Sequence, residues 1–288
     1  MATWDQLAQY LVSGLTQGSI YAIVGLGFTI IYSVTGIINF AQGEFVMLGG
    51  MLAYTLLAFF KLPVPLAFVL AILLVAGAGY LLNRLAIRPA RHASVLSLII
   101  VTIGASVFIR GIAGQAWGKD PFPIPAFSGE EAIPIAGAMV LPQSLWIMGT
   151  ALAITAVLHV FMGYTMLGKA LRACAVNRRA AALVGIDAQT MSMISFSLSG
   201  ALGAVGGIII APVSMTSYDV GLMLGLKGFV AAALGGFTSL IATVVGGIVL
   251  GVAEALGAGL ISSAYKDAIA IAILFLALFF RAGKGEAG

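Results

Sequence analysis

The feature that most constrains this chain is its scarcity of charge along long apolar stretches. Of its 288 residues, 61% are hydrophobic and only 8% are charged, whereas an ordinary soluble domain carries about 25% charged residues. A chain this poor in charge could not cover its surface in water. The sequence therefore predicts an all-α protein, a polytopic transmembrane helix bundle with lipid as its solvent.

Apolar windows follow one another along the chain, separated by proline, glycine or charged residues. They cover about 8–32, 37–60, 64–83, 95–115, 144–162, 191–211, 223–239, 241–260 and 264–281. A spanning helix needs about 20 apolar residues, so we expect about eight or nine spans. The lower number applies if 223–239 is a re-entrant segment. A single transmembrane domain over 1–288 leaves no room for a second, soluble domain.

Basic residues gather at window ends, where they signal orientation. The three clusters are Arg84, Arg88 and Arg91; Lys169, Arg172, Arg178 and Arg179; and Arg281 with Lys284. Placing all three in the cytoplasm makes the segment of about 118–143 extracytoplasmic. With nine crossings, the N-terminus is extracytoplasmic and the C-terminus cytoplasmic. The net charge of +4 thus indicates topology rather than nucleic-acid binding.

A faint internal repeat relates the two halves at an offset of 186 residues. It aligns Ser13-Gly14 with Ser199-Gly200 and Leu48-Gly49-Gly50 with Leu234-Gly235-Gly236. Chance could produce such matches in a glycine-rich chain. If the repeat is real, the predicted topology makes it inverted, an arrangement that transporters use.

Polar residues and glycines interrupt two of the apolar windows. One interruption covers 35–44 and contains Asn39, Gln42 and Glu44; the other covers 221–236 and contains Lys227. Broken helices at membrane depth are tolerated where they are buried in protein or line a water-filled path. These residues are therefore candidates for a translocation path.

Glu44 and Glu254 are acids inside apolar windows. Such a group costs on the order of 3 kcal/mol in the membrane, so it pairs with a partner or faces a cavity. A path role and a structural hydrogen bond both fit either residue, with Glu254 favouring structure. Arg110, near the outer end of its window, is interpreted as a snorkelling residue. Asp219 and Lys227 could form one ion pair.

No motif for an enzyme is present in the sequence. It has no P-loop pattern for ATP, no catalytic triad and no paired catalytic carboxylates. We predict no catalytic residues and no metal site. The single Cys174 excludes an intramolecular disulfide and is interpreted as a small packing residue.

The longest polar cytoplasmic segment covers about 163–190 and is basic and alanine-rich. Asn177 is a plausible helix cap, and Gly185 a plausible helix stop. Either the segment docks into a groove of a partner, or it is an ordinary loop that only sets orientation.

Several motifs resemble one known family. Arg179-Ala180-Ala181-x-x-x-Gly185 is similar to the EAA-x-x-x-G loop of ABC importer permeases, with Arg in place of Glu. The chain also resembles the branched-chain amino-acid (Liv-type) permeases in order along nearly its whole length. The segments that carry this resemblance are 18–22, 37–44, 168–186, 226–236, 253–256 and 265–267.

The resemblance implies a type II-like importer fold with an inverted repeat, in a bacterial-type inner membrane. It implies a heterodimer with a related second permease, two cytoplasmic ATP-binding subunits and an extracytoplasmic substrate-binding protein. The 163–190 segment would be the coupling helix, and its candidate coupling residues are Lys169, Arg172, Arg178, Arg179 and Gly185. The chain itself would need no cofactor, because the partner subunits would bind ATP.

The resemblance leaves the cargo open. Gln42 stands where the family commonly has His, and Gln cannot titrate near neutral pH. Expected cargoes are branched-chain or other hydrophobic amino acids, or a urea, amide or carboxylate compound. The alternative function is a secondary transporter or channel that works without ATPases and uses Glu44 or Glu254 as an ion-coupled group.

Overall fold

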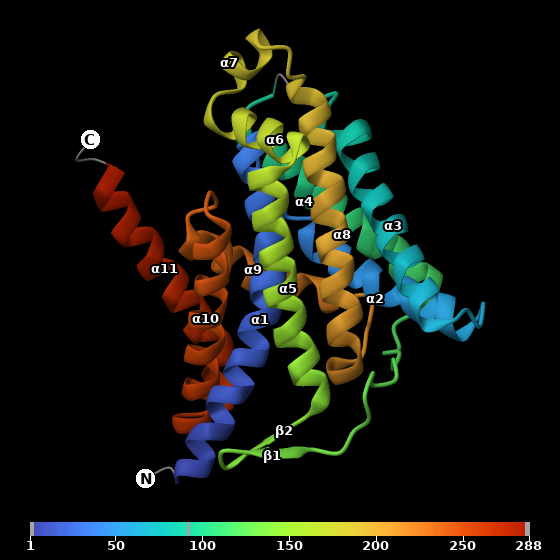
Figure 1. The fold of residues 1–288 in the computed structure, drawn as a ribbon, viewed down its shortest axis with the longest axis vertical. Coiled ribbons are helices and arrows are strands. Elements are labelled where there is room, and N and C mark those ends of the chain that lie inside the picture. The colour runs from blue at the N-terminus through green and yellow to red at the C-terminus, as the bar shows by residue number, and fades with distance from the viewer. Residues whose placement is uncertain (1–2, 91–92, 286–288) are drawn as a thin grey trace.

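The computed structural model describes residues 3–90 and 93–285, with side chains through Leu276 and at Phe279. Arg91 lies outside the described residues, as do the side chains of Arg281 and Lys284. The described chain is mostly helical, as the apolar windows predict, and its helices bundle around one central helix (Figure 1).

The helices follow the apolar windows closely. In chain order they are α1 (Trp4–Thr35), α2 (Gln42–Ala58), α3 (Val64–Leu82) with its π-helical extension η1 (Asn83–Ile87), α4 (Val95–Trp117), α5 (Pro142–Tyr164), α6 (Met166–Val176), α7 (Arg178–Leu183), α8 (Ala188–Ser214), α9 (Val220–Gly235), α10 (Leu240–Leu260), the 3-10 turn η2 (Ser263–Tyr265) and α11 (Lys266–Gly285).

Six helices in the described chain are long and apolar enough to cross a bilayer. They are α1, α3 with η1, α4, α5, α8 and α10. Helix α2 has 17 residues and α9 has 16, fewer than the roughly 20 that a span needs. The expected count of eight or nine spans is therefore not confirmed, and α2 and α9 are short because polar, non-helical backbone precedes each of them.

Helix α1 forms the centre of the bundle. It is buried along most of its length and packs against α10, α8 and α9. The contact with α10 is a backbone contact: a Cβ on Gly251 would collide with the backbone of Gly18. Small residues permit this approach in lipid, where close packing rather than hydrophobicity holds helices together. A similar contact joins Gly43 of α2 to Gly221 of α9.

The two ends of the bundle differ. Figure 1 places α6 and α7 at one end, and the N-terminus with a small hairpin at the other. The hairpin pairs β1 (Ile133–Ile135) with β2 (Ala138–Val140), so the 118–143 segment has more structure than the expected loop. Ala136 and Gly137 both have positive φ in its turn, as tight hairpin turns require. Gln9 of α1 exchanges two hydrogen bonds with Met139.

The inverted repeat is not confirmed at the predicted register. Helices α1 and α8 run in opposite directions (Figure 1), as an inverted pair would. However, an offset of 186 carries residues 42–58 of α2 onto 228–244, across the turn between α9 and α10. A gap-free repeat therefore does not pair α2 with one helix.

Candidate functional site

The segment between α1 and α2 is non-helical backbone held inside the protein. Gly36 ends α1 in the left-handed conformation, with φ of 71°, where a side chain would be strained. Asn39 is fully buried, and its Oδ1 accepts a hydrogen bond from the N–H of Ala41 at 3.1 Å. Its Nδ2 has no partner among the described residues. Thr102 of α4 fixes the segment by accepting from the N–H of Phe40 at 3.2 Å.

The side chain of Gln42 connects α2 to α8 through hydrogen bonds. It is fully buried at the start of α2. Its Nε2 donates to the carbonyl of Ser199 in α8 at 3.2 Å, and the Ser199 hydroxyl contacts both Gln42 Oε1 and the carbonyl of Gly27 in α1. With one proton, this hydroxyl donates to one of them at a time. Three helices therefore meet at Gln42.

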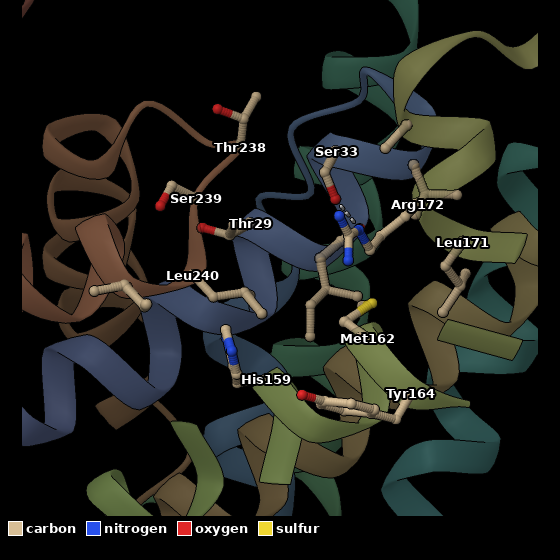
Figure 2. A pocket seen from close by; sticks show the side chains of 15 residues that line it. Thr29, Ser33, His159, Met162, Tyr164, Leu171, Arg172, Thr238, Ser239 and Leu240 are labelled. Carbon is tan, nitrogen blue, oxygen red and sulfur yellow. Dashed lines mark hydrogen bonds between the residues drawn. The ribbon is translucent and has the colours of Figure 1, made fainter. Parts of the chain in front are cut away.

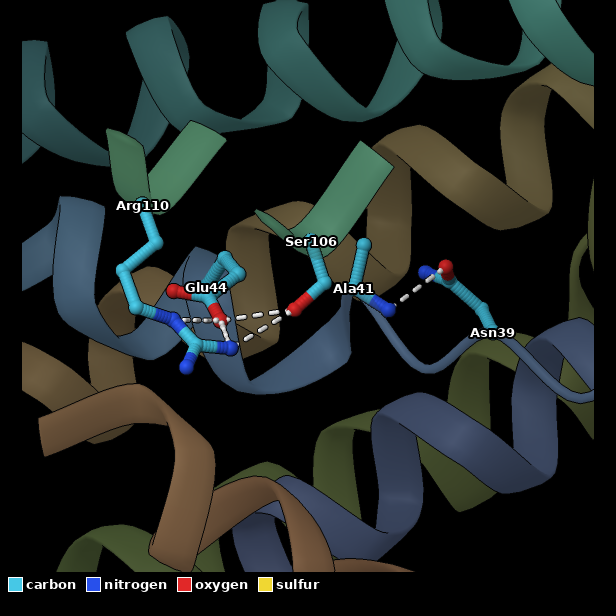
Figure 3. A network of polar contacts seen from close by, with 5 residues as sticks. All are labelled: Asn39, Ala41, Glu44, Ser106 and Arg110. Carbon is cyan, nitrogen blue, oxygen red and sulfur yellow. Dashed lines mark hydrogen bonds and ion pairs between the residues drawn. The ribbon is translucent and has the colours of Figure 1, made fainter. Parts of the chain in front are cut away.

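Glu44 lies in an ion pair that joins α2 to α4 (Figure 3). Its side chain is 1% exposed, and its Oε1 accepts from Arg110 Nη2 at 2.9 Å, from Arg110 Nε at 3.2 Å and from Ser106 Oγ at 2.8 Å. Glu44 Oε2 is buried and has no hydrogen-bond partner in the described chain. The interpretation of Arg110 as a snorkelling residue was therefore incomplete, because its guanidinium neutralises a buried acid.

Glu254 and Lys227 form a second buried network. Lys227 Nζ lies 3.2 Å from Glu254 Oε1 and 3.0 Å from Asp267 Oδ1, while the Tyr21 hydroxyl donates to Glu254 Oε2 at 2.7 Å. The expected pair between Asp219 and Lys227 was wrong: Asp219 instead accepts from the Ser217 hydroxyl at 2.7 Å. The network connects α1, α9, α10 and the start of α11.

The structure thus separates the five path candidates into three places. Asn39 and Glu44 flank the start of α2, Gln42 is turned toward α8, and Lys227 with Glu254 lies between α9 and α10. Sequence reasoning missed Ser106, Tyr21 and Asp267 as partners. Only their polarity could have signalled them, since the bonds join residues 62 and 233 positions apart.

The 163–190 segment contains two short helices with the predicted caps. Asn177 accepts from the N–H groups of Arg179 and Ala180, both at 3.0 Å, at the start of α7. Gly185 follows α7 with φ of 86°, which confirms the expected stop. Val176 and Leu183 are both 89% exposed, so apolar side chains project from this end of the protein.

One side chain connects this segment to the broken backbone. Arg178 Nη1 of α7 donates to the carbonyl of Thr35 at 3.3 Å, directly before Gly36. In contrast, the Arg179 side chain forms no hydrogen bond or ion pair with the described residues. Burial raises the pKa of the Cys174 thiol against a smaller opposing effect of Arg178, consistent with a packing role in α6.

A cavity of about 590 Å³ lies beside α6 (Figure 2). Side chains of α1, α5, α6 and the turn between α9 and α10 line it, including Ser33, His159, Arg172 and Ser239. Among the described residues, no group of three or more His, Cys, Asp or Glu side chains is placed to hold a metal. Because Arg172, a coupling candidate, lines this cavity, it lies at the boundary between α6 and the bundle.

These features define a class: a multi-pass, all-α membrane protein with buried ion pairs and a capped helical segment at one end. A family model described as the branched-chain amino acid transport system permease component matches residues 10–278. The chain belongs to this family.

Relatives match over nearly the whole chain. The high-affinity branched-chain amino acid transport system permease protein LivH of Escherichia coli (strain K12) is 33% identical over 285 residues, covering 94% of this chain and 92% of its own length. Its counterpart BraD of Pseudomonas aeruginosa is 34% identical, covering 95% and 93%. The ribose import permease protein RbsC of Escherichia coli (strain K12) is 26% identical, covering 77% and 67%.

Proposed function

We propose that this chain is the membrane subunit of an ABC importer that moves a branched-chain or related hydrophobic amino acid, or a similar small solute, into the cytoplasm. ATP is hydrolysed on two partner subunits. A related second permease completes the membrane part, and a binding protein delivers cargo from outside. The relatives named for branched-chain amino acid transport favour this cargo, while the ribose relative indicates that the family's cargoes vary.

The observation that carries this proposal is the contact between the 163–190 segment and the α1–α2 break. Helices α6 and α7 expose Val176 and Leu183 as well as basic side chains, which suit a docking groove. Arg178 donates a hydrogen bond to the carbonyl of Thr35, directly before Gly36. Motion of docked ATPases therefore has a direct mechanical route to the backbone that leads to Asn39 and Glu44.

Orientation follows from the same segment. With α6 and α7 in the cytoplasm, the hairpin and N-terminus face outward, at the opposite end of the bundle (Figure 1). Helix α2 then begins within the membrane and runs outward. In this orientation Asn39 and Glu44 are path residues at membrane depth, where an unpaired polar group is expensive and a passing solute or water supplies the missing partner.

The test is uptake into proteoliposomes that contain this chain, its second permease and both ATPases, with the binding protein outside. We expect leucine uptake that requires ATP and survives collapse of proton and sodium gradients. The second candidate, an ion-coupled transporter, is favoured only by the buried Glu44–Arg110 and Glu254–Lys227 pairs. Uptake that persists without ATP and stops when the gradients collapse would establish it instead.

A further inference from the structure

A groove of about 330 Å³ lies beside the C-terminal half of α4. Its lining includes Arg110, Gly111, Gly114, Lys119 and Tyr218. It therefore adjoins the Glu44 network, since Arg110 belongs to both. The remaining lining residues are Val107 and Gln115, so two cations and no acid line the groove among the described residues.

Arg110 enters this groove with donors to spare. A guanidinium has five N–H donors. Nε uses one on Glu44, and Nη2 uses two on Glu44 and Ser106. Nη1 makes no hydrogen bond to any described residue, and Figure 3 shows one guanidinium nitrogen directed away from Glu44 and Ser106. The side chain is 22% exposed, so this edge is open to a ligand.

The anchoring of Arg110 prepares it for binding. Glu44 and Ser106 hold the guanidinium from behind, so little side-chain freedom is lost when a ligand arrives. Glu44 also balances the positive charge of Arg110, so the charge of Lys119 is the net positive charge of the groove. A carboxylate on a ligand therefore meets a net positive charge in the groove.

The remainder of the groove suits an apolar group. Nothing lies within 4 Å of a Cβ built on Gly111, whereas one built on Gly114 would contact the Tyr218 ring at 3.3 Å. Beyond Arg110, the groove is therefore open at Gly111 and is bounded by the Tyr218 ring beside Gly114. An aliphatic chain lying there would pack against the Tyr218 ring.

We propose that this groove binds the carboxylate of the cargo on Arg110 Nη1, with the aliphatic part against Gly111 and Tyr218. The inference rests on the proposed function and narrows its cargo class: the cargo carries a carboxylate, which excludes urea and neutral amides. Arg110 is thereby a specificity-determining residue on the extracytoplasmic side of Glu44.

The experiment follows modification of Arg110 by phenylglyoxal, read by mass spectrometry, in the assembled importer in liposomes. Leucine, 4-methylpentanoate and leucinamide are added separately. We expect leucine and 4-methylpentanoate to protect Arg110, by about tenfold at a concentration of about ten times Kd, and leucinamide to give no protection. The exposed Arg84 and Arg88, which lie outside both the groove and the 163–190 segment, serve as internal references whose rates stay constant.

A variant tests whether leucine protects Arg110 by lying in the groove rather than by binding elsewhere in the importer. Gly111→Leu fills the open part of the groove without touching the Arg110–Glu44 pair, and should abolish protection by leucine. Three results would overturn the proposal. They are equal protection by leucinamide, no reaction at Arg110 without ligand, and a modification rate that depends only on whether the liposomes contain anionic or neutral lipid. ATP-driven leucine uptake in the same liposomes distinguishes this failure from a failure of the proposed function.

Discussion

The two buried glutamates of this protein have similar exposure but different surroundings. Glu44 is 1% exposed and Glu254 is 0% exposed. Glu254 lies among α1, α9 and α10, the tightly packed centre of the bundle, with Tyr21 and Lys227 as partners. Glu44 pairs with Arg110 on the peripheral helix α4, beside a groove. We infer that Glu254 belongs to the scaffold and Glu44 to the translocation path.

The largest effect is expected for Glu254→Ala. Removing one partner of a buried pair leaves an uncompensated charge and costs about 3–5 kcal/mol, here reduced somewhat because Lys227 keeps Asp267. We expect a lower yield and a markedly lower Tm in detergent. Glu254→Gln, which still accepts from Tyr21, should lose less. An unchanged Tm in the alanine variant would mean that this network is not part of the scaffold.

Glu44→Ala should affect transport rather than folding. Arg110 is partly exposed and can reach water when its partner is lost, so yield and Tm stay near those of the parent protein. Uptake should fall about tenfold or more, which corresponds to about 1.4 kcal/mol. Asn39→Ala should act in the same direction. Normal uptake with normal expression would assign these polar groups to structure.

Arg178→Ala extends the comparison to the cytoplasmic end. The variant loses the hydrogen bond to the Thr35 carbonyl, worth about 1 kcal/mol. We expect transported solute per ATP hydrolysed to fall severalfold, while association with the ATPases is kept. Arg179→Ala is the matched control, since its side chain has no bonded partner in the described structure. Equal losses in both variants would indicate a general charge effect.

The smallest effect is expected at Asp187, which caps α8. Hydrogen bonds from Thr190 and Gln189 lower the pKa of this carboxyl below its ordinary value of 3.8. A lowered pKa stabilises the fold above the unfolded-state value, and the contribution is lost as pH falls through the folded-state value.

Asp187→Ala should therefore lower the free energy of unfolding at pH 7 by the contribution of one helix cap, about 0.5 kcal/mol at this exposed site, and lower Tm accordingly. The difference from the parent protein should shrink as the pH falls below 3.8. Asp187→Asn, which caps without titrating, should show no such loss. A large effect on uptake would place the start of α8 with the moving parts rather than the scaffold.

The sequence predicted local features well and long-range partners poorly. Apolar windows located the helices, and Asn177 and Gly185 marked the ends of α7 correctly. These are local events, decided within a few residues. The partners of Glu44 and Lys227 depend on which helix faces meet, and hydrophobicity does not specify a face in a chain apolar on all sides.

Two features of the fold were missed for related reasons. Hydrophobicity gave α2 and α9 the appearance of full spans, but non-helical backbone before each helix shortens them, paired with Thr102 before α2 and with Phe122 before α9. The 133–140 hairpin lies in a proline-containing segment, and it forms where Gln9 of α1 supplies hydrogen bonds to Met139. In each case a contact with a distant residue decided the local structure.

The most direct test of the difference between the two acids is access to water. In a Cys174→Ser background, Ser106→Cys places a thiol beside Glu44, and Leu250→Cys places one a turn before Glu254. We predict that a membrane-impermeant thiol reagent labels the first in the assembled importer, at a rate that ATP and cargo change, and does not label the second. Equal labelling of both thiols, or labelling of Leu250→Cys alone, would contradict the account.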